Sequence, residues 1–110
     1  AGELKHGTIS LIEEGTLVVA LATQPALFEK TVSNIREVVA RGASVVLVTT
    51  DDFTGDESVC QHTVRLPKCL YEFSASLSII PMQLLAYYIA VERNCDVDKP
   101  RNLAKSVTVE

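Results

Sequence analysis

Lys105 and His6 are the side chains whose types point to the most specific chemistry in this chain. An unprotonated lysine amine can add to a carbonyl carbon and form a Schiff base. A lysine pKa of about 10.4 keeps the amine protonated at neutral pH, so this role needs a closed pocket that lowers the pKa. The neutral imidazole of His6 can take a proton from a hydroxyl group near pH 7. Taken alone, the lysine also fits a frayed terminus and the histidine a surface loop, so both alternatives stay open here.

Four other polar side chains are less specific. Asp51 and Asp52 follow an apolar run and could form a phosphoacceptor or metal site, but two carboxylates at a strand end are ordinary in loops, and we favour the loop. His62 has no partner pattern and is interpreted as structural. Arg101 could pair with a carboxylate or a phosphate, and nothing in the sequence decides between them.

The cysteines and the composition exclude several classes of protein. Cys60, Cys69 and Cys95 are odd in number and irregular in spacing, which fits neither a disulfide framework nor a zinc site. They are interpreted as buried thiols in a reducing cytosol. The net charge of -4, without a basic stripe, argues against nucleic acid. The apolar stretches look too short for a membrane span, and no signal peptide is evident.

Short apolar runs predict the strands of this chain. Leu17–Ala22 and residues 44–49 are continuous apolar runs typical of strands buried on both faces. Residues 62–67 alternate in polarity and stop at Pro67, which suits an edge strand. Strands that alternate with helices imply an α/β fold with a parallel sheet and right-handed crossovers, and 110 residues form at most one domain.

Two helices are expected between and after these strands. The first starts near Pro25 and ends before Gly42, which suits a C-terminal cap. Its apolar stripe consists of Phe28, Val32, Ile35 and Val39. Residues 74–93 are apolar on most faces and predict a buried helix, which Pro81 should kink or restart.

Both ends of the chain carry motifs of one known family. Residues 96–110, DVDKPRNLAKSVTVE, resemble the C-terminus of the glucosamine-6-phosphate synthases, also called glutamine–fructose-6-phosphate aminotransferases (isomerising). Residues 2–7, GELKHG, match a second segment of this family, and residues 81–88 resemble its last long helix. The middle of the chain agrees in pattern only. Thr8 stands where the family usually has proline, which should loosen the start of the helix after Gly7.

The resemblance assigns roles to individual residues. Lys105 matches the lysine that forms an imine with fructose 6-phosphate and opens the sugar ring. Ala104, beside it, is assigned to substrate binding. His6 matches the histidine that assists ring opening and is supplied to the neighbouring subunit's site. The resemblance implies no cofactor and no metal.

The resemblance also implies a fold and a larger parent. Residues 1–93 would be the C-terminal portion of a sugar isomerase (SIS) domain, a parallel-sheet three-layer α/β sandwich truncated at its N-terminal side, and residues 94–110 an irregular active-site tail. The chain begins at Ala1 without an initiator methionine, so we expect a piece of a longer chain. The parent would add a glutaminase domain and a first SIS domain, form a homodimer in the cytoplasm, and make glucosamine 6-phosphate from fructose 6-phosphate and glutamine. The piece alone should be inactive.

Two rival functions remain. SIS domains also serve as regulatory modules that bind sugar phosphates, although such a sensor needs no imine-forming lysine. A flavodoxin-like interaction domain would fit the strand–helix pattern and the Asp51-Asp52 pair, but similarity of fold alone is weak support for function.

Overall fold

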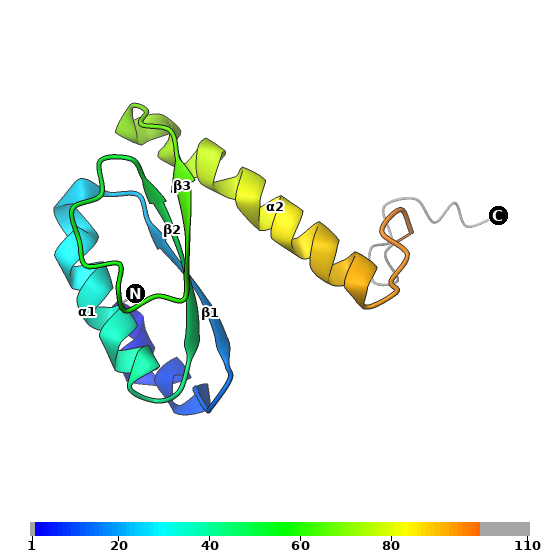
Figure 1. Ribbon diagram of the computed structural model, residues 1–110, viewed down its shortest axis with the longest axis horizontal. Helices are drawn as coiled ribbons and strands as arrows, with labels where there is room; N and C mark the ends of the chain where they lie inside the picture. Colours follow the sequence, from blue (N-terminus) through cyan, green and yellow to red (C-terminus); the bar gives the residue numbers. More distant parts are fainter. Residues whose placement is uncertain (1, 100–110) are drawn as a thin grey trace. The chain divides into compact units, whose positions relative to one another are not determined.

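The computed structural model describes residues 2–99 of the chain (Figure 1). Internal contacts divide the chain into two compact units, Ala1–Ser78 and Ile79–Glu110. The first contains the sheet and its covering helix, and the second contains most of the last helix. The predicted division into residues 1–93 and a tail of residues 94–110 stays a prediction, because most of that tail lies outside the described residues.

The sheet has three parallel strands in the order β1-β2-β3, formed by Leu17–Ala22, Ser44–Thr50 and His62–Leu66. The predicted α/β class with a parallel sheet is therefore confirmed. β2 lies between the other two and is the most deeply buried strand, as its continuous apolar run indicates. β3 lies at an edge, as its alternating polarity predicts. β1 lies at the other edge, and the prediction that it is buried on both faces is wrong, because only Ala22 of this strand is buried in the described structure.

Helix α1, Phe28–Val39, covers one face of the sheet. A short 3₁₀ turn, Pro25–Leu27, leads into it, because the fixed φ of proline suits a first helical turn. Its buried residues recur at three- and four-residue spacing: Phe28, Val32, Ile35 and Val38. The predicted stripe is thus correct except at its last position, where Val38 is buried and Val39 is only partly buried against the core. These side chains pack on Ala22, Val45 and Leu47 of the sheet.

Gly42 ends α1 as predicted. Its φ of +93° is a left-handed conformation that glycine adopts without penalty. The Gly42 N–H donates to the Val39 carbonyl, and the Ala43 N–H donates to the Val38 carbonyl. This pair of bonds is a Schellman motif, which satisfies carbonyls left free at the helix end.

The crossover from β2 to β3, residues 51–61, contains neither helix nor strand. Parallel crossovers are usually helical. Here the segment lies on the α1 side of the sheet (Figure 1), where the Phe53 ring packs edge-on against Phe28 with ring centroids 4.8 Å apart. Gly55 passes so close to Phe53 and Val32 that an added Cβ would contact both side chains. An extended segment therefore covers part of this face in place of a helix.

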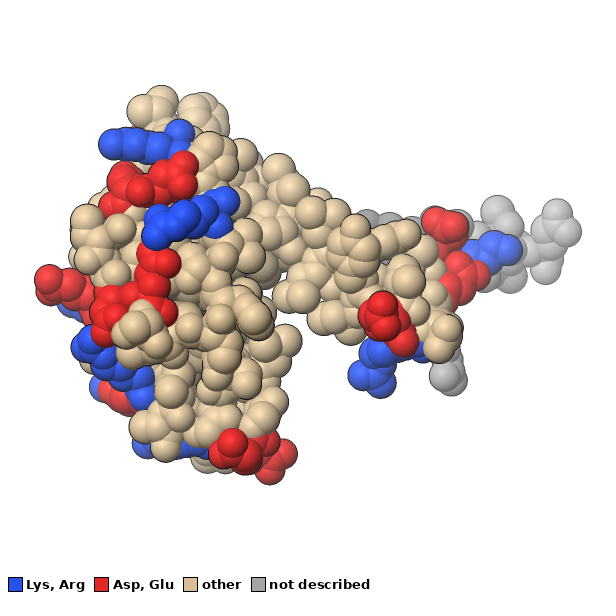
Figure 2. All heavy atoms as spheres, in the orientation of Figure 1, with Lys and Arg blue, Asp and Glu red and all other residues tan. Residues whose placement is uncertain are grey.

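Helix α2, Ser74–Glu92, follows a 3₁₀ turn at Tyr71–Phe73 and continues through Pro81. The prediction of a helix here is confirmed, but the prediction that it is buried is wrong for the described residues, where only Ser74 and Ser78 of this helix are buried. The physical reason is that an apolar composition does not by itself supply a covering segment, and Leu84 and Tyr88 are 52% and 60% exposed in the described structure. Figure 2 shows a surface almost free of charged side chains along α2.

By length and composition, Tyr71–Glu92 would suffice to cross a membrane. The argument that every apolar stretch is too short is therefore wrong for this one. The core helix of a soluble protein has the same two properties, so they are weak evidence for a membrane segment.

Candidate active site

His6 lies on a short N-terminal 3₁₀ segment, η1, Gly2–His6, which a second one, η2, Thr8–Leu11, follows directly. Leu4 of η1 is half-buried and packs against the core cluster beneath α1. Burial of this apolar side chain attaches η1 to the first compact unit.

An ion pair makes a second attachment. The Lys5 Nζ lies 2.7 Å from Oε1 of Glu37, which belongs to the last turns of α1. Nothing in the sequence pattern links these two residues, which lie far apart in the chain. The structure therefore brings together two charged residues that sequence reasoning missed.

The His6 side chain is exposed to solvent. The next residue, Gly7, is bonded to both sides, because the Gly7 N–H donates to the Leu4 carbonyl at 3.4 Å and the Ser10 hydroxyl donates to the Gly7 carbonyl at 2.7 Å. An exposed imidazole on a fixed backbone can exchange protons with a molecule that approaches from outside this unit.

An apolar cavity of about 310 Å³ lies between η1, β1 and α1. Leu4 lines it on one side, residues 18–21 of β1 on another, and Ile35 and Val38 on the α1 side, with Thr31 and Asn34 as its polar residues. It contains no carboxylate, histidine or cysteine side chain. Such a lining offers packing space rather than acid–base groups.

Lys105 and Ala104, the predicted imine-forming and substrate-binding residues, lie outside the described residues, as does Arg101. Their predicted roles stay predictions. Of the predicted site, the structure therefore describes the His6 segment alone.

Asp51 and Asp52 have the loop role that we favoured. The Asp51 N–H donates to the Leu66 carbonyl at the end of β3, and Lys68 approaches Asp52 to 3.7 Å. The nearby Thr50 hydroxyl and the Lys68 charge hold the pKa of the Asp52 carboxyl below its usual range. These contacts connect the ends of β2 and β3.

His62 and the cysteines show no catalytic arrangement. The prediction of buried thiols is wrong, because Cys60 and Cys69 are only partly buried and Cys95 is exposed. His62 is exposed at the start of β3 and pairs in register with Val46. Burial raises the pKa of the Cys60 thiol, and the Glu57 and Asp56 charges raise it further, so this thiol is a poor nucleophile. Among residues 2–99, no three metal-binding side chains come together.

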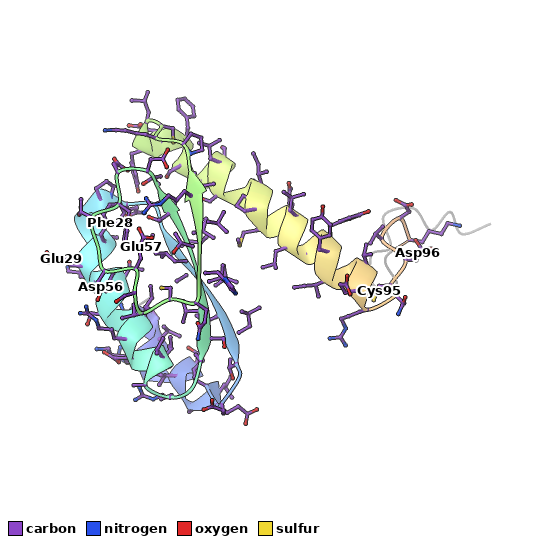
Figure 3. The ribbon with its side chains drawn as sticks, in the orientation of Figure 1. Phe28, Glu29, Asp56, Glu57, Cys95 and Asp96 are labelled. Carbon is purple, nitrogen blue, oxygen red and sulfur yellow. The ribbon has the colours of Figure 1, made fainter. Side chains whose placement is uncertain are left out.

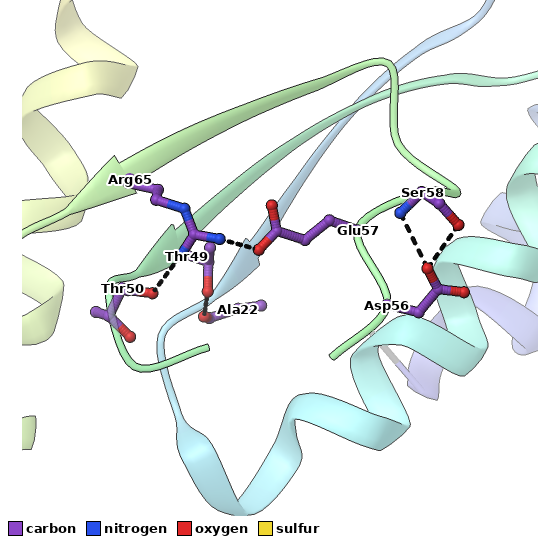
Figure 4. Close-up of polar contacts among 7 residues, drawn as sticks. All are labelled: Ala22, Thr49, Thr50, Asp56, Glu57, Ser58 and Arg65. Carbon is purple, nitrogen blue, oxygen red and sulfur yellow. Dashed lines mark hydrogen bonds and ion pairs between the residues drawn. The ribbon is translucent and has the colours of Figure 1, made fainter. Parts of the chain in front are cut away.

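The crossover carries polar contacts that the sequence did not reveal (Figure 4). Asp56 accepts a hydrogen bond from the Ser58 hydroxyl at 2.6 Å and pairs with Arg36 of α1 at 2.9 Å. Glu57 pairs with Arg65 of β3, so the two neighbouring carboxylates fasten the crossover to different elements. Figure 3 shows Asp56 and Glu57 beside helix α1. The Asp-Glu-Ser sequence marks a turn, but its partners are visible only in the fold.

Comparisons with known proteins agree with this geometry. The family model described as "SIS domain" matches residues 1–93. The chain is 59% identical, over all 110 residues, to the glutamine–fructose-6-phosphate aminotransferase (isomerizing) of Caldanaerobacter subterraneus subsp. tengcongensis, and 54% identical to that of Clostridium tetani. It spans 18% of the length of each of these relatives.

A solved structure gives the same result. It is the C-terminal domain of glucosamine-fructose-6-phosphate aminotransferase from Francisella tularensis, 31% identical, with a TM-score of 0.78. The match covers 87% of this chain and 27% of that one.

Proposed function

The chain belongs to the SIS domain family, and we propose that it is the isomerase segment of a longer glutamine–fructose-6-phosphate aminotransferase. The single observation that carries this proposal is the 59% identity that extends over every residue of the chain, including the tail with Lys105. An identity of this extent, with the GELKHG and NLAKS motifs intact, supports a shared reaction as well as a shared fold.

The proposed role of Lys105 is that of a nucleophile. Its amine adds to the C2 carbonyl of open-chain fructose 6-phosphate, and the loss of water then gives an imine. The pocket that lowers the amine pKa would come from the rest of the parent protein, with Ala104 beside the bound sugar.

The proposed role of His6 is to help open the ring. Its imidazole accepts the proton of the C2 hydroxyl while the bond from C2 to the ring oxygen breaks, and the ring oxygen takes up a proton. The exposure of His6 supports delivery of this group to a site outside its own compact unit, such as that of a second subunit in a homodimer.

The remaining partners follow from the same proposal. A glutaminase domain would supply ammonia and a first SIS domain would bind the sugar phosphate. The free thiols of Cys60, Cys69 and Cys95 are consistent with a reducing compartment, and we place the protein in the cytoplasm.

Borohydride trapping in the full-length protein tests the proposal. Reduction in the presence of fructose 6-phosphate should attach the sugar to Lys105, because borohydride converts an imine to a stable secondary amine. Lys105→Arg should abolish this attachment, since arginine stays protonated. Lys99→Arg is the matched control and should leave trapping unchanged.

Two results would contradict the proposal. One is a trapped sugar on Lys99, and the other is isomerase activity that survives Lys105→Arg. If fructose 6-phosphate binds the full-length protein but is neither trapped nor converted, the regulatory-module alternative takes its place. The 110-residue chain by itself should form no glucosamine 6-phosphate from fructose 6-phosphate with either glutamine or ammonia.

A further inference from the structure

The His6 ring depends on its backbone for its position. Among the described residues, no hydrogen bond reaches the imidazole, so no neighbour fixes its direction. The direction of the ring is then set by η1, whose own attachments are the half-buried Leu4 and the Lys5–Glu37 ion pair. Whatever holds η1 also holds His6.

Glu37 is a rigid partner for Lys5. It precedes Val38, which is 1% exposed and lies in the core, and the Schellman motif at Gly42 closes the helix a few residues later. The backbone of Glu37 therefore has little freedom, and its carboxylate attaches η1 to a firmly packed helix.

We propose that Lys5 and Glu37 are positioning residues for His6: their ion pair holds η1 against α1 and sets the direction in which the imidazole leaves the unit. This inference rests on the proposed role of His6 in ring opening. Neither Lys5 nor Glu37 needs to touch the sugar.

The expected size of the effect is modest. Exposed ion pairs are worth up to about 1 kcal/mol, and about 1.4 kcal/mol corresponds to a tenfold change in an equilibrium. Loss of the pair should lower the fraction of molecules in which the His6 imidazole has its productive direction about 2- to 5-fold. The rate of ring opening should fall by a similar factor. High salt screens exposed ion pairs, so it should lower the rate of ring opening by the wild-type protein toward the rate of the variants.

The same helix provides a matched control. Arg36, next to Glu37, pairs with Asp56 at 2.9 Å. The side chains of Arg36 and Asp56 are 57% and 44% exposed, and those of Lys5 and Glu37 are 55% and 33% exposed. This second pair holds the crossover rather than η1. Removing this second pair breaks a similarly exposed ion pair on α1 but leaves the attachments of η1, and thus of His6, in place.

The experiment uses the full-length protein and two substrates. Fructose 6-phosphate must be opened, whereas its 5-deoxy analogue lacks the hydroxyl that closes the ring and is always open. The kcat ratio of the first to the second substrate, taken at the pH optimum of each variant, isolates ring opening. Lys5→Met and Glu37→Gln should lower this ratio about 2- to 5-fold. Lys5→Arg, which keeps the charge, should preserve it, and Arg36→Gln should leave it unchanged.

Each outcome has one meaning. If His6→Ala leaves the ratio unchanged, the proposed role of His6 fails and the positioning role fails with it. If His6→Ala lowers the ratio strongly while Lys5→Met and Glu37→Gln behave like Arg36→Gln, only the positioning role is overturned. A fall in both kcat values with an unchanged ratio assigns the pair to general stability and also overturns the inference.

Discussion

Helices α1 and α2 differ in where their apolar side chains lie, although both are continuous. α1 buries one stripe of apolar residues against the sheet and turns Arg36 and Glu37 outward. α2 has a single charged residue, Glu92, and most of its large apolar side chains are exposed in the described structure. An amphipathic pattern specifies one buried face, whereas a helix that is apolar all round needs cover on several sides. Within the described residues, α1 therefore has its partner in the sheet, whereas most of the large apolar side chains of α2 are exposed.

The largest expected effect tests this difference with one substitution at two places. Leu47 is fully buried beneath α1, and Leu84 of α2 is 52% exposed. In the 110-residue chain, Leu47→Ala should lower the free energy of unfolding by about 2–5 kcal/mol, because it leaves a cavity in a packed core. Leu84→Ala should change it by no more than about 0.5 kcal/mol. Urea unfolding at low protein concentration measures both.

The same pair of variants can break the comparison. Equal losses at both positions would mean that α2 is as well covered as α1 within this chain. In the full-length protein we expect Leu84→Ala to become costly as well, because the proposed parent would supply the missing cover.

A smaller effect tests how firmly the end of α1 is fixed. Gly42 has a φ of +93°, and an added Cβ would lie 2.8 Å from the Glu14 Cα, a backbone atom that cannot move aside easily. Gly15 has a φ of +81° but open space around it. Gly15→Ala should cost about 1–2 kcal/mol for the left-handed backbone alone, and Gly42→Ala clearly more. Equal shifts of the melting temperature would show that the turn adjusts freely.

The smallest effect concerns the ion pair that holds the crossover to α1. The Ser58 hydroxyl and then the Arg36 guanidinium keep the pKa of the Asp56 carboxyl below its usual range. A depressed folded pKa gives stability that is present above the unfolded value of about 4 and is lost as pH falls through the folded pKa. Asp56→Asn should therefore lower the melting temperature near pH 7 and have no effect at the acid end of the titration.

Two further variants show whether Ser58 or Arg36 contributes more to the low pKa of Asp56. Ser58→Ala should reduce the pH dependence more than Arg36→Gln, because the hydroxyl contributes more to the low pKa. The reverse order would show that the charge on α1, rather than the turn itself, fixes the crossover.

The elements that could be predicted are those with a local signal. The apolar run at residues 17–22 predicts β1, the spacing of Phe28, Val32 and Ile35 predicts the buried face of α1, and Gly42 predicts its end. In each case, the residues that form the pattern lie in the same strand or helical turn as the structure that the pattern predicts. A reading of the sequence can therefore recover such elements without knowing the fold.

The features that could not be predicted depend on distant partners. Nothing local links Lys5 to Glu37 or Asp56 to Arg36. The burial of α2 was inferred from its composition, but composition does not say which chain segment supplies the cover. The roles of Lys105 and His6 were predicted from family motifs, because neither residue type alone distinguishes a catalytic group from a solvated one.

The order of the strands has a consequence for synthesis on the ribosome. The spatial order β1-β2-β3 is also the order along the chain, so each new strand adds to a neighbour that has already emerged. At about 5–20 residues per second, residues 17–66 leave the ribosome within about 3–10 s, and α1 can cover the first pair of strands before β3 appears. Among the described elements α2 comes last along the chain, so the sheet can form before this largely apolar helix has emerged.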